Sequence, residues 1–307
     1  MREVGRIASL LPSATEIVYA LGLGDRVVGV SHSCDYPADA CTKTVLSRPR
    51  FSADGLSSGA VDAAVRSALQ RFGGVYEIDA ERLAGVRPDL LLTQGVCEVC
   101  AVPTHDAQAA AARLACCPTV LALDAHDLGG VLSSIRAVGR AAGVPARAER
   151  SVRCIERRIA AVQGRVAGRP AARVLALEWL DPPFIPGHWV PEMVALAGGS
   201  LLRGTAGRPS FAIGWEELAG LDPDVLIVMP CGFSLAAALA DADRYRAALR
   251  AVAPRAIAAG GAFVMDASAH FSRPGPRVAE GVELLAALLH PAAFPTAALA
   301  GRAAVWT

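Results

Sequence analysis

The chain has 307 residues, of which 53% are hydrophobic and 19% charged, and its formal net charge is +1. This composition is typical of an ordered globular protein, and the length exceeds what one core usually serves, so two domains are expected. A near-neutral chain without a basic cluster argues against nucleic acid as a partner, and no uninterrupted apolar run reaches the ~18 residues that a membrane span needs.

The beginning of the chain predicts a strand, a loop and a helix. Pro12, Glu16 and Asp25 interrupt its apolar residues, and the charged, apolar and cleavable regions of a signal peptide are missing from it. Ser13 and Glu16 have the spacing of a capping box, which predicts a helix starting just after the loop. No cysteine near the start could carry a lipid, so the chain as it stands is expected to stay in the cytoplasm.

An internal repeat organises the rest of the chain. ERLAGVRPDLLLTQ (81–94) and EELAGLDPDVLIVM (216–229) share Glu, Leu, Ala, Gly, Pro, Asp and Leu in the same order. Each predicts a short helix, a Pro-Asp turn and a strand buried on both faces. RIASLLPSATEIVYALGLG (6–24) and RVLALEWLDPPFIPGHWVPEMVALAGG (173–199) each predict a strand, a loop and a helix that ends at glycine.

Helical periodicity dominates the region between the two halves. From about 146 to 166 it becomes one long Arg-rich amphipathic run. Strands that alternate with helices predict a mostly parallel sheet in each half. We therefore expect an α/β protein with an N-terminal Rossmann-like lobe at 1–126, a linking helix region at 127–169 and a C-terminal lobe at 170–307.

Ligands of open parallel sheets bind beyond the carboxyl ends of the strands. This rule selects the loops that follow the predicted strands in both halves, and these loops are expected to face one another across a cleft. The expected lining is His32, Cys34, Asp35, Tyr36, Gln94, Glu178, Trp179, His188, Trp189, Phe271 and Arg273. Such a mixture of aromatic groups, thiols and few charges suits a large, mostly apolar ligand with polar edges.

The cysteines of these loops allow several chemistries. The repeat offset places Cys97 and Cys231 at nearly equivalent points, with Cys34 expected nearby. Together with Cys100 they could hold zinc or a softer ion, because zinc accepts four thiolates at about 2.3 Å. A strong zinc signature has two Cys-x-x-Cys pairs and this chain has one. Free thiols, a disulfide within the pair and a redox couple are the alternatives, and the Trp-Cys-Gly context typical of the last is missing.

Other polar side chains of these loops also have two interpretations each. His32 and His188 could ligate a transition metal as neutral imidazoles, or serve only as hydrogen-bonding loop residues. Glu178 could act as an acid or base, but no nucleophile is near it, which favours a hydrogen bond to backbone N–H groups. Arg273 could grip amide or carboxylate edges of a ligand, or belong to a helix start.

The segments RIASLLPSATEIVYALGLGDRVVGVSHSCDYP, PDLLLTQ, WEELAGLDPDVLIV and FSRPGPR extend over essentially the whole chain. They resemble the cobalamin-binding substrate-binding proteins of ABC transporters, whose relatives also carry haem and siderophores. The resemblance implies a class III substrate-binding protein fold, with two α/β lobes joined by a single long helix and a corrinoid held between them without catalysis. It also implies that Tyr36 of the DYP motif lies against the corrinoid and that Glu216 docks on a transporter permease.

The sequence differs from that family at two positions in the predicted cleft, and these differences leave more than one functional hypothesis open. QGVCEVC (94–100) stands where a cleft tryptophan is expected, and Ser210 replaces a second tryptophan. The main hypothesis is non-enzymatic binding of cobalamin or a related corrinoid, with an ABC transporter permease as partner and a periplasmic or cell-surface location if the protein is exported like its family. The alternatives are a thiolate metal-binding protein with zinc or a softer ion, and a cytoplasmic enzyme that modifies a corrinoid.

Overall fold

The computed structural model describes residues 4–96, 99 and 101–307. They form two compact units that are discontinuous in sequence. Unit 1 comprises Met1–Asp54, Ala63–Ala125 and Gly129–Cys154, and unit 2 comprises Gly55–Asp62, His126–Leu128 and Ile155–Thr307. The division into lobes at 1–126 and 170–307 with a linker at 127–169 remains a prediction from the sequence.

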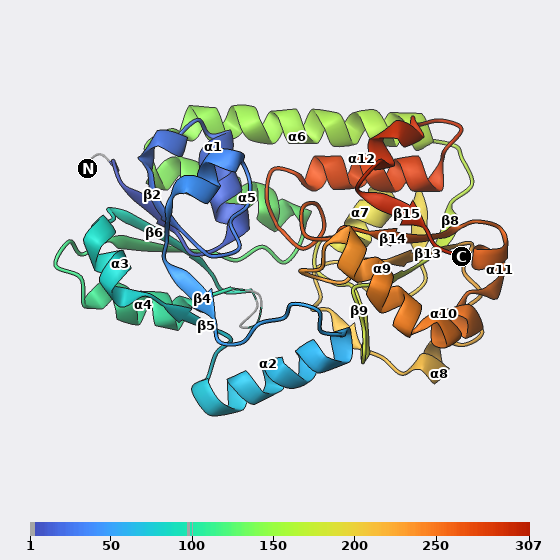
Figure 1. Ribbon diagram of the computed structural model, residues 1–307. Helices are drawn as coiled ribbons and strands as arrows, with labels where there is room; N and C mark the ends of the chain where they lie inside the picture. Colours follow the sequence, from blue (N-terminus) through green and yellow to red (C-terminus); the bar gives the residue numbers. More distant parts are fainter. Residues whose placement is uncertain (1–3, 97–98, 100) are drawn as a thin grey trace. The chain divides into compact units, whose positions relative to one another are not determined.

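A parallel sheet forms the centre of unit 1 (Figure 1). Within the described part of the chain its order is β3-β2-β1-β6-β7, with parallel pairing throughout. Two further strands, β4 and β5, pair antiparallel. Strands β1 and β6 are buried along their whole length, as expected for a parallel sheet with both faces covered. The strands are β1 (Ile7–Ser9), β2 (Val27–Val30), β3 (Thr44–Val45), β4 (Ser47–Pro49), β5 (Tyr76–Ile78), β6 (Leu90–Gln94) and β7 (Thr119–Leu123).

Helices surround this sheet. Helix α1 packs on β1 and β2, α3 on β2 and β3, and α4 on β6 and β7. The core includes Leu10, Leu46, Leu83 and Leu91. The predicted amphipathic run is confirmed as α6, one continuous helix that begins in unit 1 and ends in unit 2 (Figure 1). The helices are α1 (Pro12–Ala20), η1 (Gly24–Arg26), η2 (Ala38–Thr42), α2 (Ser58–Phe72), α3 (Ala80–Val86), α4 (Thr104–Ala112), α5 (Leu128–Ala141) and α6 (Pro145–Val166).

The predicted capping box is wrong. Helix α1 begins at Pro12 with Leu11 as its N-cap residue, and no side chain caps it. Proline suits the first helical position because it has no N–H group that needs an acceptor there. Ser13 and Glu16 therefore lie inside the helix, where both are buried.

Unit 2 has its own central sheet, with the order β11-β8-β13-β14-β15 within the described residues. All its pairings are parallel except that of β15 with β14. A smaller antiparallel sheet has the order β12-β10-β9. The strands are β8 (Ala172–Leu177), β9 (Trp179–Leu180), β10 (Pro183–Ile185), β11 (Gly199–Leu201), β12 (Phe211–Ala212), β13 (Val225–Val228), β14 (Ala262–Met265) and β15 (Ala303–Val305).

The helices of unit 2 cover that sheet, with α12 packed on α7 and α9 packed on β14. They are α7 (Val190–Leu196), α8 (Trp215–Leu218), α9 (Leu235–Arg244), α10 (Arg246–Val252), α11 (Pro254–Ala258), α12 (Val278–Leu289) and η3 (Thr296–Leu299). Among the helices that the structure describes, none combines the length and apolarity needed to cross a membrane.

The internal repeat extends to topology and backbone conformation. The order β2-β1-β6-β7 in unit 1 corresponds to β11-β8-β13-β14 in unit 2. Helices α3 and α8 precede the equivalent strands β6 and β13. After these helices, Arg87 and Asp222 occupy equivalent positions, and both have a left-handed backbone, with φ of 42° and 45°. Such values are uncommon for residues other than glycine, so their recurrence shows that the two turns have the same geometry.

The Pro-Asp pair of each repeat has a structural role. Asp89 Oδ2 accepts a hydrogen bond from the backbone N–H of Arg6 at 2.9 Å, and Asp224 Oδ2 accepts one from the backbone N–H of Arg173 at 2.8 Å. Each aspartate thus fastens the start of the neighbouring strand. The repeated Pro-Asp pair therefore stabilises the edge of each sheet opposite to its carboxyl edge.

Candidate functional site

The carboxyl edge of the sheet in unit 1 is formed by loops that follow β1, β2 and β6. In the loop after β2, Cys34 is buried, and its Sγ lies 3.1 Å from Thr15 Oγ1 and 3.2 Å from Ser31 Oγ. The backbone N–H of Cys34 also donates to the Ser31 carbonyl at 3.1 Å. The thiol of Cys34 is thus engaged by hydroxyl groups of unit 1.

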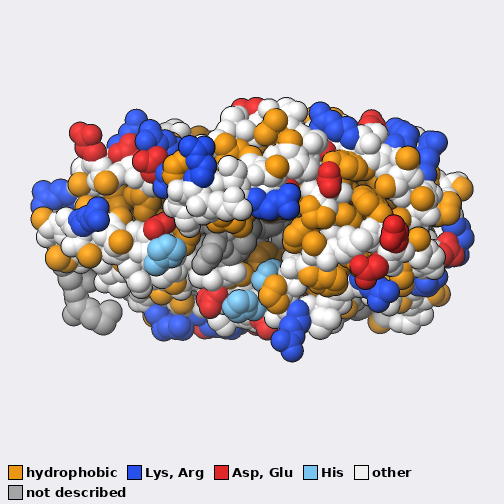
Figure 2. All heavy atoms as spheres, turned by 90° about the horizontal axis from the view of Figure 1, so that it is seen from below, with side chains coloured by type: hydrophobic (Ala, Val, Ile, Leu, Met, Phe, Trp, Pro, Cys, Tyr) orange, Lys and Arg blue, Asp and Glu red, His pale blue; other side chains and the backbone are white. Residues whose placement is uncertain are grey.

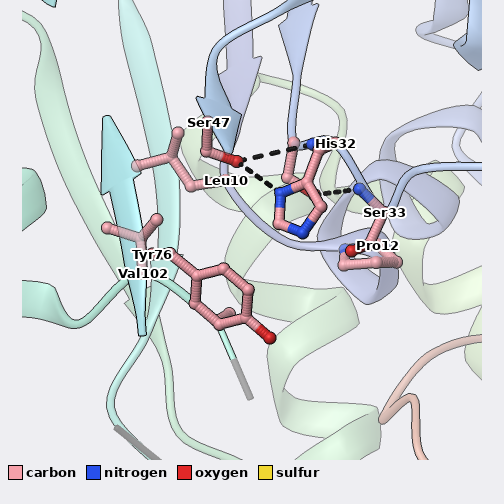
Figure 3. Close-up of a pocket in the computed structure, with 9 residues that line it drawn as sticks. Leu10, Pro12, His32, Ser33, Ser47, Tyr76 and Val102 are labelled. Atoms are coloured by element: carbon pink, nitrogen blue, oxygen red, sulfur yellow. Dashed lines mark hydrogen bonds between the residues drawn. The ribbon is translucent and has the colours of Figure 1, made fainter. Parts of the chain in front are cut away.

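A small pocket opens beside this loop. His32 and Tyr76 approach each other across it from the β2 loop and from β5 (Figure 3), with ring centroids 5.1 Å apart. His32 Nδ1 lies 3.1 Å from Ser47 Oγ. Its cavity volume is about 10 Å³, which is room for about one water molecule. Its lining is Leu10, Pro12, Ser31, His32, Ser33, Ser47, Tyr76, Ala101 and Val102.

The electrostatic state of this pocket is set by its histidine. Partial removal of the ring from water lowers the pKa of His32 below its ordinary value of 6.5. His32 is therefore neutral at pH 7, and Figure 3 shows its second ring nitrogen on the side away from Ser47. A neutral imidazole can accept or donate one hydrogen bond. The pocket can consequently hold a water molecule that hydrogen-bonds to this ring nitrogen.

The other predicted residues of unit 1 differ in exposure. Asp35 and Tyr36 are exposed, and Tyr36 is 49% accessible. Gln94 is buried at the end of β6, where its carbonyl oxygen accepts a hydrogen bond from Thr104 Oγ1 at 2.8 Å. Asp35 and Tyr36 thus lie at the surface of unit 1, whereas the Gln94 backbone helps to hold the loop after β6.

In unit 2 the equivalent edge carries aromatic side chains. Trp179 packs edge-on against Phe233, with ring centroids 5.2 Å apart and planes at 73°. Glu178 and Trp179 are half-buried, and the Glu178 carbonyl accepts a hydrogen bond from the backbone N–H of Cys231 at 3.1 Å. Cys231 is exposed. The structure thereby brings Cys231 next to Glu178, two residues that the sequence assigned to different loops.

A second group surrounds the loop before α7. Trp189 Nε1 donates to the Phe271 carbonyl at 2.8 Å, and both side chains are buried. His188 is half-buried, and its ring lies 5.6 Å from that of Trp189. Arg273 is also half-buried. Phe271 and Trp189 are therefore buried and joined by a hydrogen bond, whereas His188 and Arg273 keep partial access to solvent.

The thiolate hypothesis requires four cysteines to lie close together, and the structure does not test that arrangement. Cys97 and Cys100 lie outside the described residues, and Cys34 and Cys231 belong to different units. Among the residues described, no group of three or more His, Cys, Asp or Glu side chains could hold a metal ion. The described residues thus give no support to a zinc site built from the four cysteines.

Several residues of these surfaces were not predicted from the sequence. Ser47 and Tyr76 line the pocket of unit 1 because strands β4 and β5 pair. No local sequence pattern predicts that pairing. Phe233 follows β13 and supports Trp179. Glu81 could have been found, because the repeat offset from 81 to 216 pairs it with Glu216. Both glutamates are exposed in the first turn of their helices.

The face drawn in Figure 2 carries Lys and Arg side chains interspersed with Asp and Glu side chains, without a large patch of one sign. This distribution agrees with the net charge of +1. It favours a ligand recognised by aromatic contacts and a few polar groups over a polyanion.

Two α/β units, each with a parallel sheet and ligand-accessible loops at its carboxyl edge, define the class of two-lobed substrate-binding proteins with a long connecting helix. The sequence profile described as "Periplasmic binding protein" matches residues 7–254. The chain belongs to this family, and it has the class III substrate-binding protein fold.

Curated relatives extend over most of the chain. The vitamin B12-binding protein of Vibrio cholerae is 24% identical over 91% of this chain and 86% of its own length. The ABC transporter substrate-binding lipoprotein YvrC of Bacillus subtilis is 25% identical, covering 95% and 82%. The cobalamin-binding protein of Halobacterium salinarum is 24% identical, covering 94% and 70%. These matches give no support to a cytoplasmic location, since the family is described as periplasmic.

Solved structures confirm the fold. The periplasmic vitamin B12-binding protein BtuF of Vibrio cholerae has a TM-score of 0.68 at 22% identity, covering 94% of this chain and 98% of its own. A periplasmic haem-binding protein of Pseudomonas aeruginosa has a TM-score of 0.70 at 23% identity, covering 94% of both chains. Proteins of this fold thus include binders of two different tetrapyrroles.

Proposed function

We propose that this protein binds cobalamin or a related corrinoid without altering it, as the substrate-binding component of an ABC transporter. The observation that carries the proposal is similarity along the chain to proteins named for vitamin B12 or cobalamin binding. The relatives are substrate-binding proteins, which supports a non-enzymatic role over the corrinoid-modifying enzyme.

The exposed loops suit the chemistry of a corrinoid, a broad macrocycle with an apolar ring and amide groups at its rim. Tyr36 in unit 1 and Trp179 in unit 2 offer aromatic faces for the ring. His32 and Asp35 in unit 1, and Glu178, His188 and Arg273 in unit 2, offer partners for amide edges. Gln94 and Phe271 contribute indirectly, by fixing the loops above them.

The experiment is a calorimetric titration of the full chain with cyanocobalamin and, separately, with haemin. Tyr36→Ala and Trp179→Ala are expected to weaken cobalamin binding at least tenfold. Phe72→Ala is the matched control for Tyr36→Ala, because Phe72, at the end of α2, is as exposed as Tyr36 (50% against 49% accessible). Binding of haemin and not of cobalamin, or equal effects of all three substitutions, would contradict the proposal.

The proposed partner is a permease, and the proposed docking residues are Glu216 and its repeat mate Glu81. Each side chain is exposed near the start of its helix. Glu81→Gln combined with Glu216→Gln is expected to leave cobalamin affinity unchanged and to reduce cobalamin-dependent growth of cells that rely on this protein. Unchanged growth would refute the docking role and leave ligand binding standing.

A further inference from the structure

Two histidines that are distant in sequence meet in unit 2. His126 is exposed in the segment that follows β7, and His188 is half-buried in the loop before α7. Their ring centroids are 6.0 Å apart and their planes are tilted by 32°. The pair consists of two histidines and no cysteine, so it is independent of the thiolate hypothesis.

The pair is held by backbone interactions. The backbone N–H of Leu128 donates to Glu192 Oε2 at 2.7 Å, which fastens the His126 segment to the first turn of α7. His188 donates its N–H to the Arg208 carbonyl at 2.7 Å, and its own carbonyl accepts from Gly207 at 3.0 Å. These hydrogen bonds hold the backbone of both segments and do not involve the imidazole rings.

His188 carries two features typical of functional residues. Its φ is +53°, in the left-handed region that favours glycine, and such backbone strain is found preferentially at active sites and ligand-binding sites. Its Nδ1 is buried and has no hydrogen-bond partner among the described residues.

We propose that His126 and His188 form a two-imidazole site for a divalent first-row transition metal ion such as zinc. With metal–nitrogen bonds of about 2.1 Å, a shared ion lies about 3.2 Å from each ring centroid, and a tetrahedral pair has centroids about 5.2 Å apart. The observed 6.0 Å requires an approach of under about 1 Å, within reach of small side-chain rotations. The remaining coordination positions are open to water or to a small-molecule donor.

The test is calorimetric titration of the full chain with zinc chloride under reducing conditions. One ion per chain is expected for the wild type, with at least tenfold weaker binding for His126→Ala and for His188→Asn. Asparagine is chosen at 188 because it tolerates a left-handed backbone. His105→Ala, which removes an exposed histidine of α4, is the matched control. A triple variant, Cys97→Ser, Cys100→Ser and Cys231→Ser, is expected to bind zinc like the wild type.

No zinc binding, or binding that survives both histidine substitutions, would overturn the proposal, as would loss in the triple cysteine variant. Cobalt(II) binding to the unmodified protein provides a test that needs no variant to fold. Weak visible bands without intense near-ultraviolet absorption indicate imidazole ligands, and this result would support the site. Intense near-ultraviolet thiolate-to-cobalt charge transfer assigns the ion to cysteines and refutes it.

Discussion

Gly187 is the position at which a single methyl group should disturb unit 2 most directly. A Cβ there would lie 2.6 Å from both Pro209 C and Ser210 N, and closer still to the Arg208 carbonyl oxygen. All three are backbone atoms, so no side-chain rotation relieves the overlap. Gly187→Ala must therefore push the 208–210 segment away from the loop that carries His188.

The expected cost follows from the contacts that this displacement breaks. Overpacking costs about 1–3 kcal/mol. The displacement also weakens the bond from Gly187 N–H to Ser210 Oγ, at 3.0 Å, and the bond from His188 N–H to the Arg208 carbonyl, at 2.7 Å. At about 0.5–1.5 kcal/mol for each bond, the total loss is about 2–6 kcal/mol.

The assay is urea unfolding followed by tryptophan fluorescence and circular dichroism. Gly164→Ala in α6 is the matched control, because a Cβ there meets nothing within 4 Å. Alanine favours a helix interior over glycine, so this variant should gain about 0.5–1 kcal/mol. The same substitution thus has opposite signs at the two positions. Wild-type stability for Gly187→Ala would refute the reasoning.

Two further predictions concern acid stability and thiol reactivity. Burial, with a smaller contribution from Arg277, lowers the pKa of His270 from 6.5 to about 4. The unfolded chain therefore takes up this proton first as the pH falls, so acidification from pH 6.5 to 4 should destabilise the wild type. His270→Gln should remove up to about 3 kcal/mol of that loss. In mass-spectrometric iodoacetamide labelling, exposed Cys231 should react in the folded protein and buried Cys34 only after unfolding; equal labelling rates would contradict the described loop.

The sequence predicted those features of the fold that local patterns encode. Continuous apolar runs identified β6 and β13 because parallel strands are buried on both faces. Amphipathic periodicity identified α6. The capping box failed because Ser13 and Glu16 have the right spacing, but Pro12 had already started the helix.

The side-chain environments at the carboxyl edges were less predictable. Whether Cys34 faces a ligand or its own unit depends on Thr15 and Ser31, which reach it only in the folded structure. Tyr76 joins the pocket through pairing of β4 with β5. His126 reaches His188 because the backbone N–H of Leu128 bonds to Glu192. Each depends on a non-local contact, which periodicity does not encode.

The most direct test of the proposed function is equilibrium dialysis of the purified protein against cobalamin, with haemin in a parallel experiment. We expect close to one cobalamin retained per chain, with a perturbed visible spectrum, and markedly weaker retention of haemin. Free passage of cobalamin across the membrane, with no spectral change at any protein concentration, would contradict corrinoid binding.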